Sequence, residues 1–214
     1  MQEDLSNIQV DARCQNLTRV IEQFVHELNV QAGKKHATAV ISRTEVFDGS
    51  KLGQKPERFI EIELIDPVLR VLGYEPLFQP TGFNGLEGQY PDFTARNLEI
   101  TNLGEVKKPG AIRNARKESY TYITDATDRP ILGIATDGLV WILHTGSEPG
   151  ELPTCTAQVD IQEIFDKVRL EQCYDRADRR SRIELRGLAQ EFVRKFSRDS
   201  VVKHVVETQS TETK

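Results

Sequence analysis

The chain has 214 residues, of which 38% are hydrophobic and 29% charged, and its formal net charge is −5. This balance is typical of a globular domain with one substantial core. No apolar run approaches the roughly 20 residues of a membrane-spanning helix, and the first segment lacks the pattern of a signal peptide. We therefore expect a soluble, cytoplasmic protein with no membrane association. The three cysteines are scattered, which argues against a disulfide framework or a zinc site.

The first part of the chain is predicted to be largely helical. Apolar residues recur at helical spacing over residues 16–30 and 56–72, and a short strand is expected between them at residues 38–41. Pro56 suits the first turn of the second helix, whereas Pro67 should kink or divide that helix.

The rest of the chain alternates strand and helix patterns, which predicts an α/β fold. Strands are expected at residues 74–79, 90–95, 100–107, 131–136 and 139–143, and helices at residues 111–124, 160–170 and 179–196. The predicted organisation is a helical extension (1–55), a core (56–145), C-terminal helices (146–206) and a disordered tail (207–214). Asp137 and Gly138, between the last two strands, are a strong hairpin signal.

Polar residues occupy positions of the central strands where apolar residues are expected. Asp92 begins one predicted strand, and Glu105 and Lys107 flank Val106 near the end of the next. Because side chains alternate across a strand, Glu105 and Lys107 share one face and Val106 takes the other. Burying two carboxylates and an ammonium group is costly unless they serve a purpose.

Phosphodiester hydrolysis would give these residues a purpose. The carboxylates of Asp92 and Glu105, with the backbone carbonyl of Val106, are oxygen ligands suited to Mg²⁺ or Mn²⁺. Such an ion polarises a phosphate and lowers the pKa of bound water. Lys107 would position or deprotonate the attacking water, or stabilise charge on the phosphate. The competing interpretation is structural: Asp92 caps a turn, and Glu105 and Lys107 form an ion pair on an edge strand.

The segment PDFTARNLEITNLGEVKKPG resembles the motif of the PD-(D/E)XK nuclease superfamily, with Asp92, Glu105 and Lys107 at the motif positions. More narrowly, residues 57–143 resemble the N-terminal nuclease part of type I restriction enzyme motor subunits, through the phrases LIDPVLRVLGYEP, PDF, GEVKKPG and TDGLVWIL. The resemblance implies a restriction-endonuclease-like core, in which a central mixed β-sheet is flanked by helices, with extra N- and C-terminal helices around it. It also implies metal-dependent DNA cleavage in a restriction or defence system.

The resemblance further implies an acidic residue on the first core helix and a Gln-x-x-x-Tyr pattern on the next one. Glu57 and Glu61 are the candidates for the first, being one turn apart on one helix face; alternatively, both merely complement the helix dipole. The nearest match to the second pattern runs from Glu118 to Tyr122, with glutamate in place of glutamine. Tyr122 would contact a phosphate or simply pack.

Basic residues follow the predicted site. Lys108 comes directly after Lys107, and Arg113, Arg116 and Lys117 share one face of the predicted helix. We expect these four residues to hold the DNA backbone near the metal, unless they form only a solvated face. The basic stretch at residues 176–186 is the alternative DNA contact.

The function expected from the sequence is therefore that of a metal-dependent DNA endonuclease. A homodimer would place two identical sites on the antiparallel strands of a duplex. The sequence contains no P-loop motif, so a helicase or specificity subunit would be a separate partner. Two alternatives remain open: a non-catalytic nucleic-acid-binding or partner-recruiting module of the same fold, and an RNA-directed nuclease.

Overall fold

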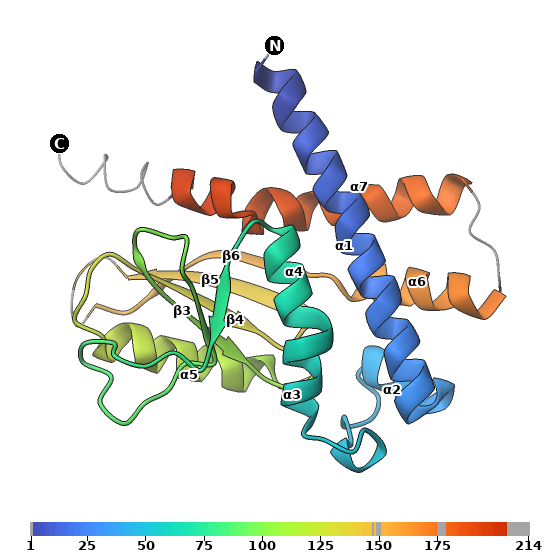
Figure 1. Ribbon diagram of the computed structural model, residues 1–214, viewed down its shortest axis with the longest axis horizontal. Coiled ribbons are helices and arrows are strands. Elements are labelled where there is room, and N and C mark those ends of the chain that lie inside the picture. The colour runs from blue at the N-terminus through green and yellow to red at the C-terminus, as the bar shows by residue number, and fades with distance from the viewer. Residues whose placement is uncertain (1, 147, 149–150, 175–178, 205–214) are drawn as a thin grey trace.

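A computed structural model describes residues 2–146, 148, 151–174 and 179–204 (Figure 1). The tail predicted at residues 207–214 lies outside this range. The helices are α1 (Gln2–Ala32), α2 (Lys34–Ile41), α3 (Pro56–Ile60), α4 (Asp66–Val71), α5 (Ile112–Asp125), α6 (Gln162–Tyr174) and α7 (Arg179–Phe196), with a 3-10 turn η1 (Gly49–Lys51) and a π turn η2 (Glu61–Ile65). The strands are β1 (Pro76–Phe78), β2 (Phe93–Ala95), β3 (Thr101–Val106), β4 (Ile131–Thr136), β5 (Val140–Gly146) and β6 (Thr154–Asp160).

The six strands form one mixed sheet in chain order, β1-β2-β3-β4-β5-β6. Only the β3–β4 pair is parallel, and α5 makes the crossover between these two strands. In Figure 1, α5 lies along one side of the sheet, and α7 lies along the other side with α1 crossing it. The expectation of an α/β fold with a mixed sheet flanked by helices is confirmed.

Alternate side chains of the central strands divide between two apolar layers. Val106 and Trp141 point into the main core, where α1 and α7 supply the most helical partners. The indole ring of Trp141 packs 5.3 Å from the ring of Phe192. Leu103 of β3 points the other way, into a smaller cluster with Ile123 of α5. The main core draws residues from Cys14 through to Val201, so helices from both ends of the chain complete it.

Two local predictions differ from the structure. The strand expected at residues 38–41 is wrong: this segment belongs to α2. Its β-branched residues suggested a strand, but Ala37, Val40 and Ile41 follow helical spacing, and all three are buried. Strand β6 was not predicted, because only Val159 on it is fully buried and the remaining pattern is polar and exposed. None of the described helices has the length and apolar character needed to cross a bilayer.

The predicted helix at 56–72 forms as a continuous helical segment with a π turn inside it. The backbone N–H of Asp66 donates to the carbonyl of Glu61, a five-residue spacing. Pro67 follows directly, and it has no N–H with which to continue the regular ladder. The wider turn thus accommodates the proline within one helical segment, so the helix is not divided, which was one of the two outcomes expected of Pro67.

Candidate active site

Glu105 lies on an interior strand. Strand β3 is paired with β2 on one side and with β4 on the other, whereas the edges of the sheet are β1 and β6. The side chain of Glu105 is 2% exposed. The parallel register with β4 continues one residue beyond the strand, where the Lys107 N–H donates to the Thr136 carbonyl at 2.9 Å. Glu105 and Lys107 thus form the ion pair of the structural interpretation, but on an interior strand and not on an edge.

Asp92 lies beside Glu105 at the point where the β2–β3 ladder ends. Phe93 is the register partner of Gly104, which makes Asp92 and Glu105 neighbours across the two strands. The Asp92 N–H donates to the Gly104 carbonyl at 2.9 Å, and its Oδ2 accepts the Val106 N–H at 2.7 Å. A side chain thus replaces the next backbone partner of β3, and this fixes the Asp92 carboxylate against the strand that carries Glu105.

Lys107 connects the strand to α5. Its ammonium group forms ion pairs with Glu105 and, at 2.8 Å, with Glu118 of α5. Burial opposes the charged form of Lys107, but hydrogen bonds and charges from Glu105 and Glu118 outweigh burial and raise its pKa. Burial also acts to raise the pKa of Glu118, yet its contacts with the Glu105 carboxyl and the Lys107 ammonium lower it. Lys107 is therefore a cation held between two carboxyl groups.

The Glu105 carboxyl is the least solvated group of this cluster. Burial is the main cause that raises its pKa, to about 9, and the neighbouring Glu118 and Asp92 carboxyls add to the effect. Lys107 acts in the opposite direction without cancelling the rise. Within the described residues, Oε2 of Glu105 has no hydrogen-bond partner. A buried carboxylate oxygen without a partner is costly, and a bound cation would remove that cost.

Glu61, at the junction of α3 and η2, faces the same cluster. Burial raises its pKa, a hydrogen bond from Arg58 acts against this, and the charge of Asp92 adds to the rise. Arg58 Nη1 donates to Glu61 Oε2 at 2.9 Å. Glu57 influences Glu61 only through its charge. Of the two candidate glutamates, Glu61 is thus the one that the fold brings toward Asp92.

Tyr122 and Glu118 lie one turn apart on the side of α5 that faces the cluster. The pKa of Tyr122 is raised to about 12 by burial first, and then by the charges of Glu105, Glu118 and Asp92. Glu118 was noted in the sequence only as an imperfect motif position. Its ion pair with Lys107 makes it a full member of the cluster.

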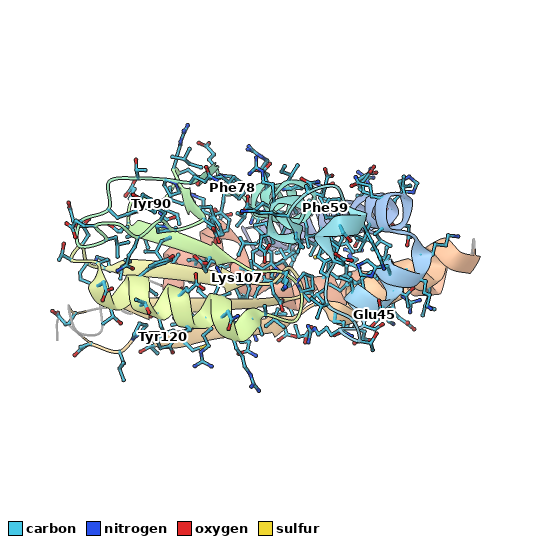
Figure 2. The ribbon with its side chains drawn as sticks, turned by 90° about the horizontal axis from the view of Figure 1, so that it is seen from below. Glu45, Phe59, Phe78, Tyr90, Lys107 and Tyr120 are labelled. Atoms are coloured by element: carbon cyan, nitrogen blue, oxygen red, sulfur yellow. The ribbon has the colours of Figure 1, made fainter. Side chains whose placement is uncertain are left out.

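The other predicted DNA-binding residues lie elsewhere. Arg113, Arg116 and Lys117 line an open depression on the outer surface of α5, and neither the cluster carboxylates nor Lys107 line it. In Figure 2, Lys107 and Tyr120, a residue of this depression, are drawn on opposite sides of α5. Lys108 is half-buried after the end of β3, and its carbonyl accepts the Ala111 N–H at 3.0 Å. Residues 176–178 and the side chains of residues 179–182 in the second basic stretch lie outside the described part of the chain.

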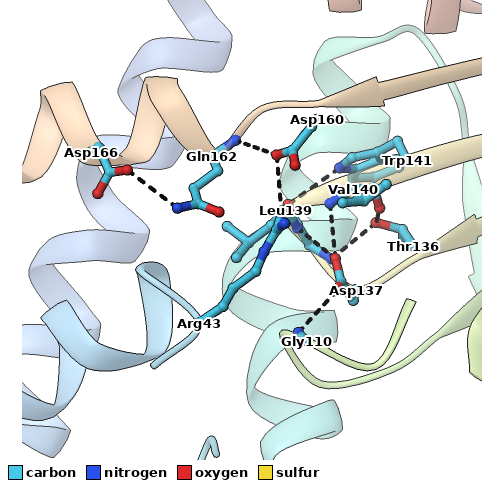
Figure 3. Close-up of polar contacts among 11 residues, drawn as sticks. Arg43, Gly110, Thr136, Asp137, Leu139, Val140, Trp141, Asp160, Gln162 and Asp166 are labelled. Atoms are coloured by element: carbon cyan, nitrogen blue, oxygen red, sulfur yellow. Dashed lines mark hydrogen bonds and ion pairs between the residues drawn. The ribbon is translucent and has the colours of Figure 1, made fainter. Parts of the chain in front are cut away.

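Asp137 is a buried acid that sequence reasoning treated only as a turn signal. Its Oδ1 accepts the N–H groups of Leu139 and Val140 at 3.1 and 2.8 Å, and its Oδ2 accepts the Gly110 N–H at 2.9 Å (Figure 3). Burial raises its pKa, while these three hydrogen bonds oppose the rise. The Asp137 side chain therefore joins the β4–β5 hairpin to the turn between Lys107 and α5.

The donor chemistry of the cluster fits a hard divalent cation. Asp92 and Glu105 offer carboxylate oxygens, one of which lacks a partner, and the cluster contains no histidine or cysteine. In the described chain, however, no three acidic, histidine or cysteine side chains are already arranged as a cation site. Instead of a metal cation, the Lys107 ammonium contacts one oxygen of Glu105. Binding an ion between Asp92 and Glu105 would thus require Lys107 to yield that oxygen.

Comparison of the chain with protein-family models, with curated proteins and with solved structures finds no match.

Proposed function

We propose that this protein is a divalent-metal-dependent phosphodiesterase that cleaves DNA. The observation that carries the proposal is the placement of Glu105: a buried carboxylate on an interior strand, with one oxygen unpartnered, next to Asp92 and Lys107. Such an arrangement costs folding free energy and contributes little to packing. Perturbed carboxylates gathered around one lysine are typical of functional sites.

Asp92, Glu105 and the Val106 carbonyl would hold Mg²⁺ or Mn²⁺. The ion, when bound, supplies a Lewis acid for the phosphate and lowers the pKa of a bound water. Lys107, released from Glu105, would orient that water or stabilise charge on a phosphate oxygen. Glu118 would hold the Lys107 ammonium in place, and Glu61 would add negative charge on the helix side of the cluster.

A second candidate function is a non-catalytic nucleic-acid-binding or partner-recruiting module. Its support is the contact between the Lys107 ammonium and the Glu105 carboxyl, which occupies one oxygen of that carboxyl without any metal. In this case the cluster would stabilise the fold and bind no ion. RNA remains an alternative substrate, and a two-fold dimer or a separate helicase or specificity subunit would complete a restriction system.

The test measures cleavage and metal binding separately. Purified wild-type chain is incubated with supercoiled plasmid, single-stranded DNA and single-stranded RNA, in Mg²⁺, in Mn²⁺ and in excess chelator. Mn²⁺ binding is measured by titration calorimetry. Asp92→Asn and Glu105→Gln test the cluster, and Glu99→Gln is the matched control. Glu99 is an exposed acid that precedes β3.

We expect metal-dependent DNA cleavage by wild type and by the Glu99 variant, and loss of cleavage and of Mn²⁺ binding in the two cluster variants. Cleavage in excess chelator would overturn the metal requirement. An absence of both Mn²⁺ binding and cleavage would favour the non-catalytic module, and cleavage confined to RNA would change the substrate. Circular dichroism of each variant establishes that it is folded.

A further inference from the structure

The outer surface of α5 carries a concentration of positive charge. An open depression of about 470 Å³ lies against this helix, with Arg113, Arg116, Lys117, Tyr120, Thr124 and Leu152 among its lining residues. The buried side of the helix is set by Ala115, Ser119 and Ile123, which face the sheet. The depression, called here the outer α5 depression, is therefore a surface feature that faces solvent.

The three cations in the outer α5 depression are available for a ligand. Within the described ranges, none of them takes part in an ion pair. Arg116 is held in place by Tyr120, with its guanidinium 5.3 Å from the ring centre and Nη2 3.4 Å from the hydroxyl oxygen. Asp125, an acid that also lines the depression, accepts a hydrogen bond from Gln89 at 2.8 Å. The depression therefore has an excess of positive charge.

Tyr120, which contacts Arg116, is itself packed against the protein interior. The Tyr120 ring contacts the buried His144 ring edge to face, with 4.6 Å between the ring centres. Arg113 and Lys117 stand one turn apart on the same face. A row of cations on one helix face matches an extended polyanion better than a single small anion, because several phosphates can be contacted at once.

One edge of the depression comes close to the carboxylate cluster, although Tyr120 lies on the opposite side of α5 from Lys107. Lys117 lines the depression, and the next residue, Glu118, binds Lys107. The charge of Lys117 also lowers the pKa of Glu118, after the larger effects of burial, Glu105 and Lys107. A chain lying on the outer surface of α5 would thus pass within a short distance of the cluster without entering it.

We infer that the outer α5 depression binds the phosphodiester backbone of nucleic acid, as a holding surface separate from the carboxylate cluster. The choice of nucleic acid among polyanions rests on the proposed function, whereas the inference that the depression binds a polyanion rests on its own charge. Its contacts are with phosphates, so binding is expected to be independent of base sequence and to weaken with salt.

The experiment compares two triple variants in the full chain. Arg113→Ala/Arg116→Ala/Lys117→Ala removes the depression's cations. Lys34→Ala/Lys35→Ala/Lys51→Ala removes the same charge from a second basic hollow, next to α2. Affinities for fluorescent single- and double-stranded DNA are measured by anisotropy in chelator, which prevents metal-dependent cleavage, across a salt series. Poly-glutamate and inorganic phosphate are tested as competitors.

We expect the α5 variant to lose at least tenfold in DNA affinity and its salt dependence to flatten by roughly one unit of slope for each phosphate that it no longer binds. The α2 variant should bind like wild type. Equal affinities of the two variants would overturn the inference. Competition by poly-glutamate as strong as that by DNA would assign the depression to an acidic protein, and competition by phosphate alone would assign it to a small anion. Because binding is measured without cleavage, an inactive wild-type protein would count against the proposed function only.

Discussion

The Asp137 carboxylate accepts a hydrogen bond from the Gly110 backbone N–H at 2.9 Å, across 27 positions of the sequence. This bond ties the turn after β3 to the β4–β5 hairpin. The other oxygen of Asp137 accepts hydrogen bonds from the N–H groups of Leu139 and Val140 within the hairpin itself. One buried side chain thus controls both the shape of the hairpin and the direction in which the chain leaves Lys107.

Asp137→Asn should separate these two roles. The amide keeps one oxygen for the hairpin and places an NH2 group opposite the Gly110 N–H, which leaves a buried donor unsatisfied at a cost of about 1–3 kcal/mol. We expect kcat for DNA cleavage to fall with little change in KM, because the turn next to Lys107 is released. Thr136→Val is the control. The Thr136 hydroxyl bonds Val140 and Gly138 within the same hairpin and does not contact Gly110, and the substitution keeps the Thr136 carbonyl that accepts the Lys107 N–H. Equal kcat values in the two variants would show that Asp137 acts only on stability.

Lys107→Met should separate chemistry from metal binding. The substitution removes the ammonium group that pairs with Glu105, and a cation would no longer compete with it for that oxygen. We expect cleavage to be abolished while Mn²⁺ affinity, measured by titration calorimetry, is unchanged or higher. Lys108→Met serves as the comparison for metal affinity, because within the described residues the ion pairs of the cluster involve Lys107 and not Lys108. Weaker Mn²⁺ binding by Lys107→Met would contradict the expected competition.

The metal-free protein should lose stability with rising pH through Glu105. Burial raises the pKa of this carboxyl from 4.5 to about 9 in the folded chain. A raised carboxyl pKa stabilises the fold fully below the unfolded value, and the contribution is lost as the pH rises between the two values. Glu105→Gln removes this loss. In excess chelator its Tm should exceed that of wild type by a margin that grows from about pH 5 to about pH 8.5, at roughly 2–4 °C per kcal/mol. A Tm difference that stays constant with pH, or the same pH-dependent difference in Glu99→Gln, would contradict the assignment of this loss of stability to Glu105.

Gly104→Ala should damage both the fold and the site. A Cβ at Gly104 would collide with the ring of Phe93, its partner on β2. Phe93 is buried and cannot move without shifting Asp92, so we expect a loss of about 1–3 kcal/mol in unfolding free energy and weaker Mn²⁺ binding. Gly187→Ala is the contrasting variant. Gly187 lies in α7 with open space around it, and alanine there should stabilise the helix by up to about 1 kcal/mol. Chemical denaturation measures both, and an unchanged stability of Gly104→Ala would be inconsistent with the packing described.

The sequence predicted the elements that have strong periodicity. The central strands, α5 and the two C-terminal helices are found where alternation and helical spacing placed them. It failed at α2, where β-branched residues concealed a helical burial pattern, and at β6, where an exposed edge gives almost no apolar signal. The first failure arises because tertiary burial, rather than local propensity, decided the conformation, and the second because backbone pairing with β5 did.

The part of the site that lies on β2 and β3 could be predicted from the sequence. Strand alternation placed Glu105 and Lys107 on one face, and their ion pair agrees with that placement. The partners supplied by other elements could not be predicted in the same way: Glu118 contacts Lys107 from the crossover helix α5, and Asp137 contacts Gly110 from the β4–β5 hairpin. The shared face of Arg113 and Lys117 was also readable, but not which side of α5 would pack against the sheet.

Trp141, the single tryptophan of the chain, gives the molecule an internal optical probe. Its indole is fully buried, stacks edge to face on Phe192 and Phe196 of α7, and donates to the carbonyl of Gly138, the residue next to Asp137. Its fluorescence therefore reports on two events at once. Undocking of α7 would let water reach the indole and shift its emission to longer wavelength, and rearrangement of the Asp137 hairpin would change its emission intensity. No label is needed to follow either event in solution.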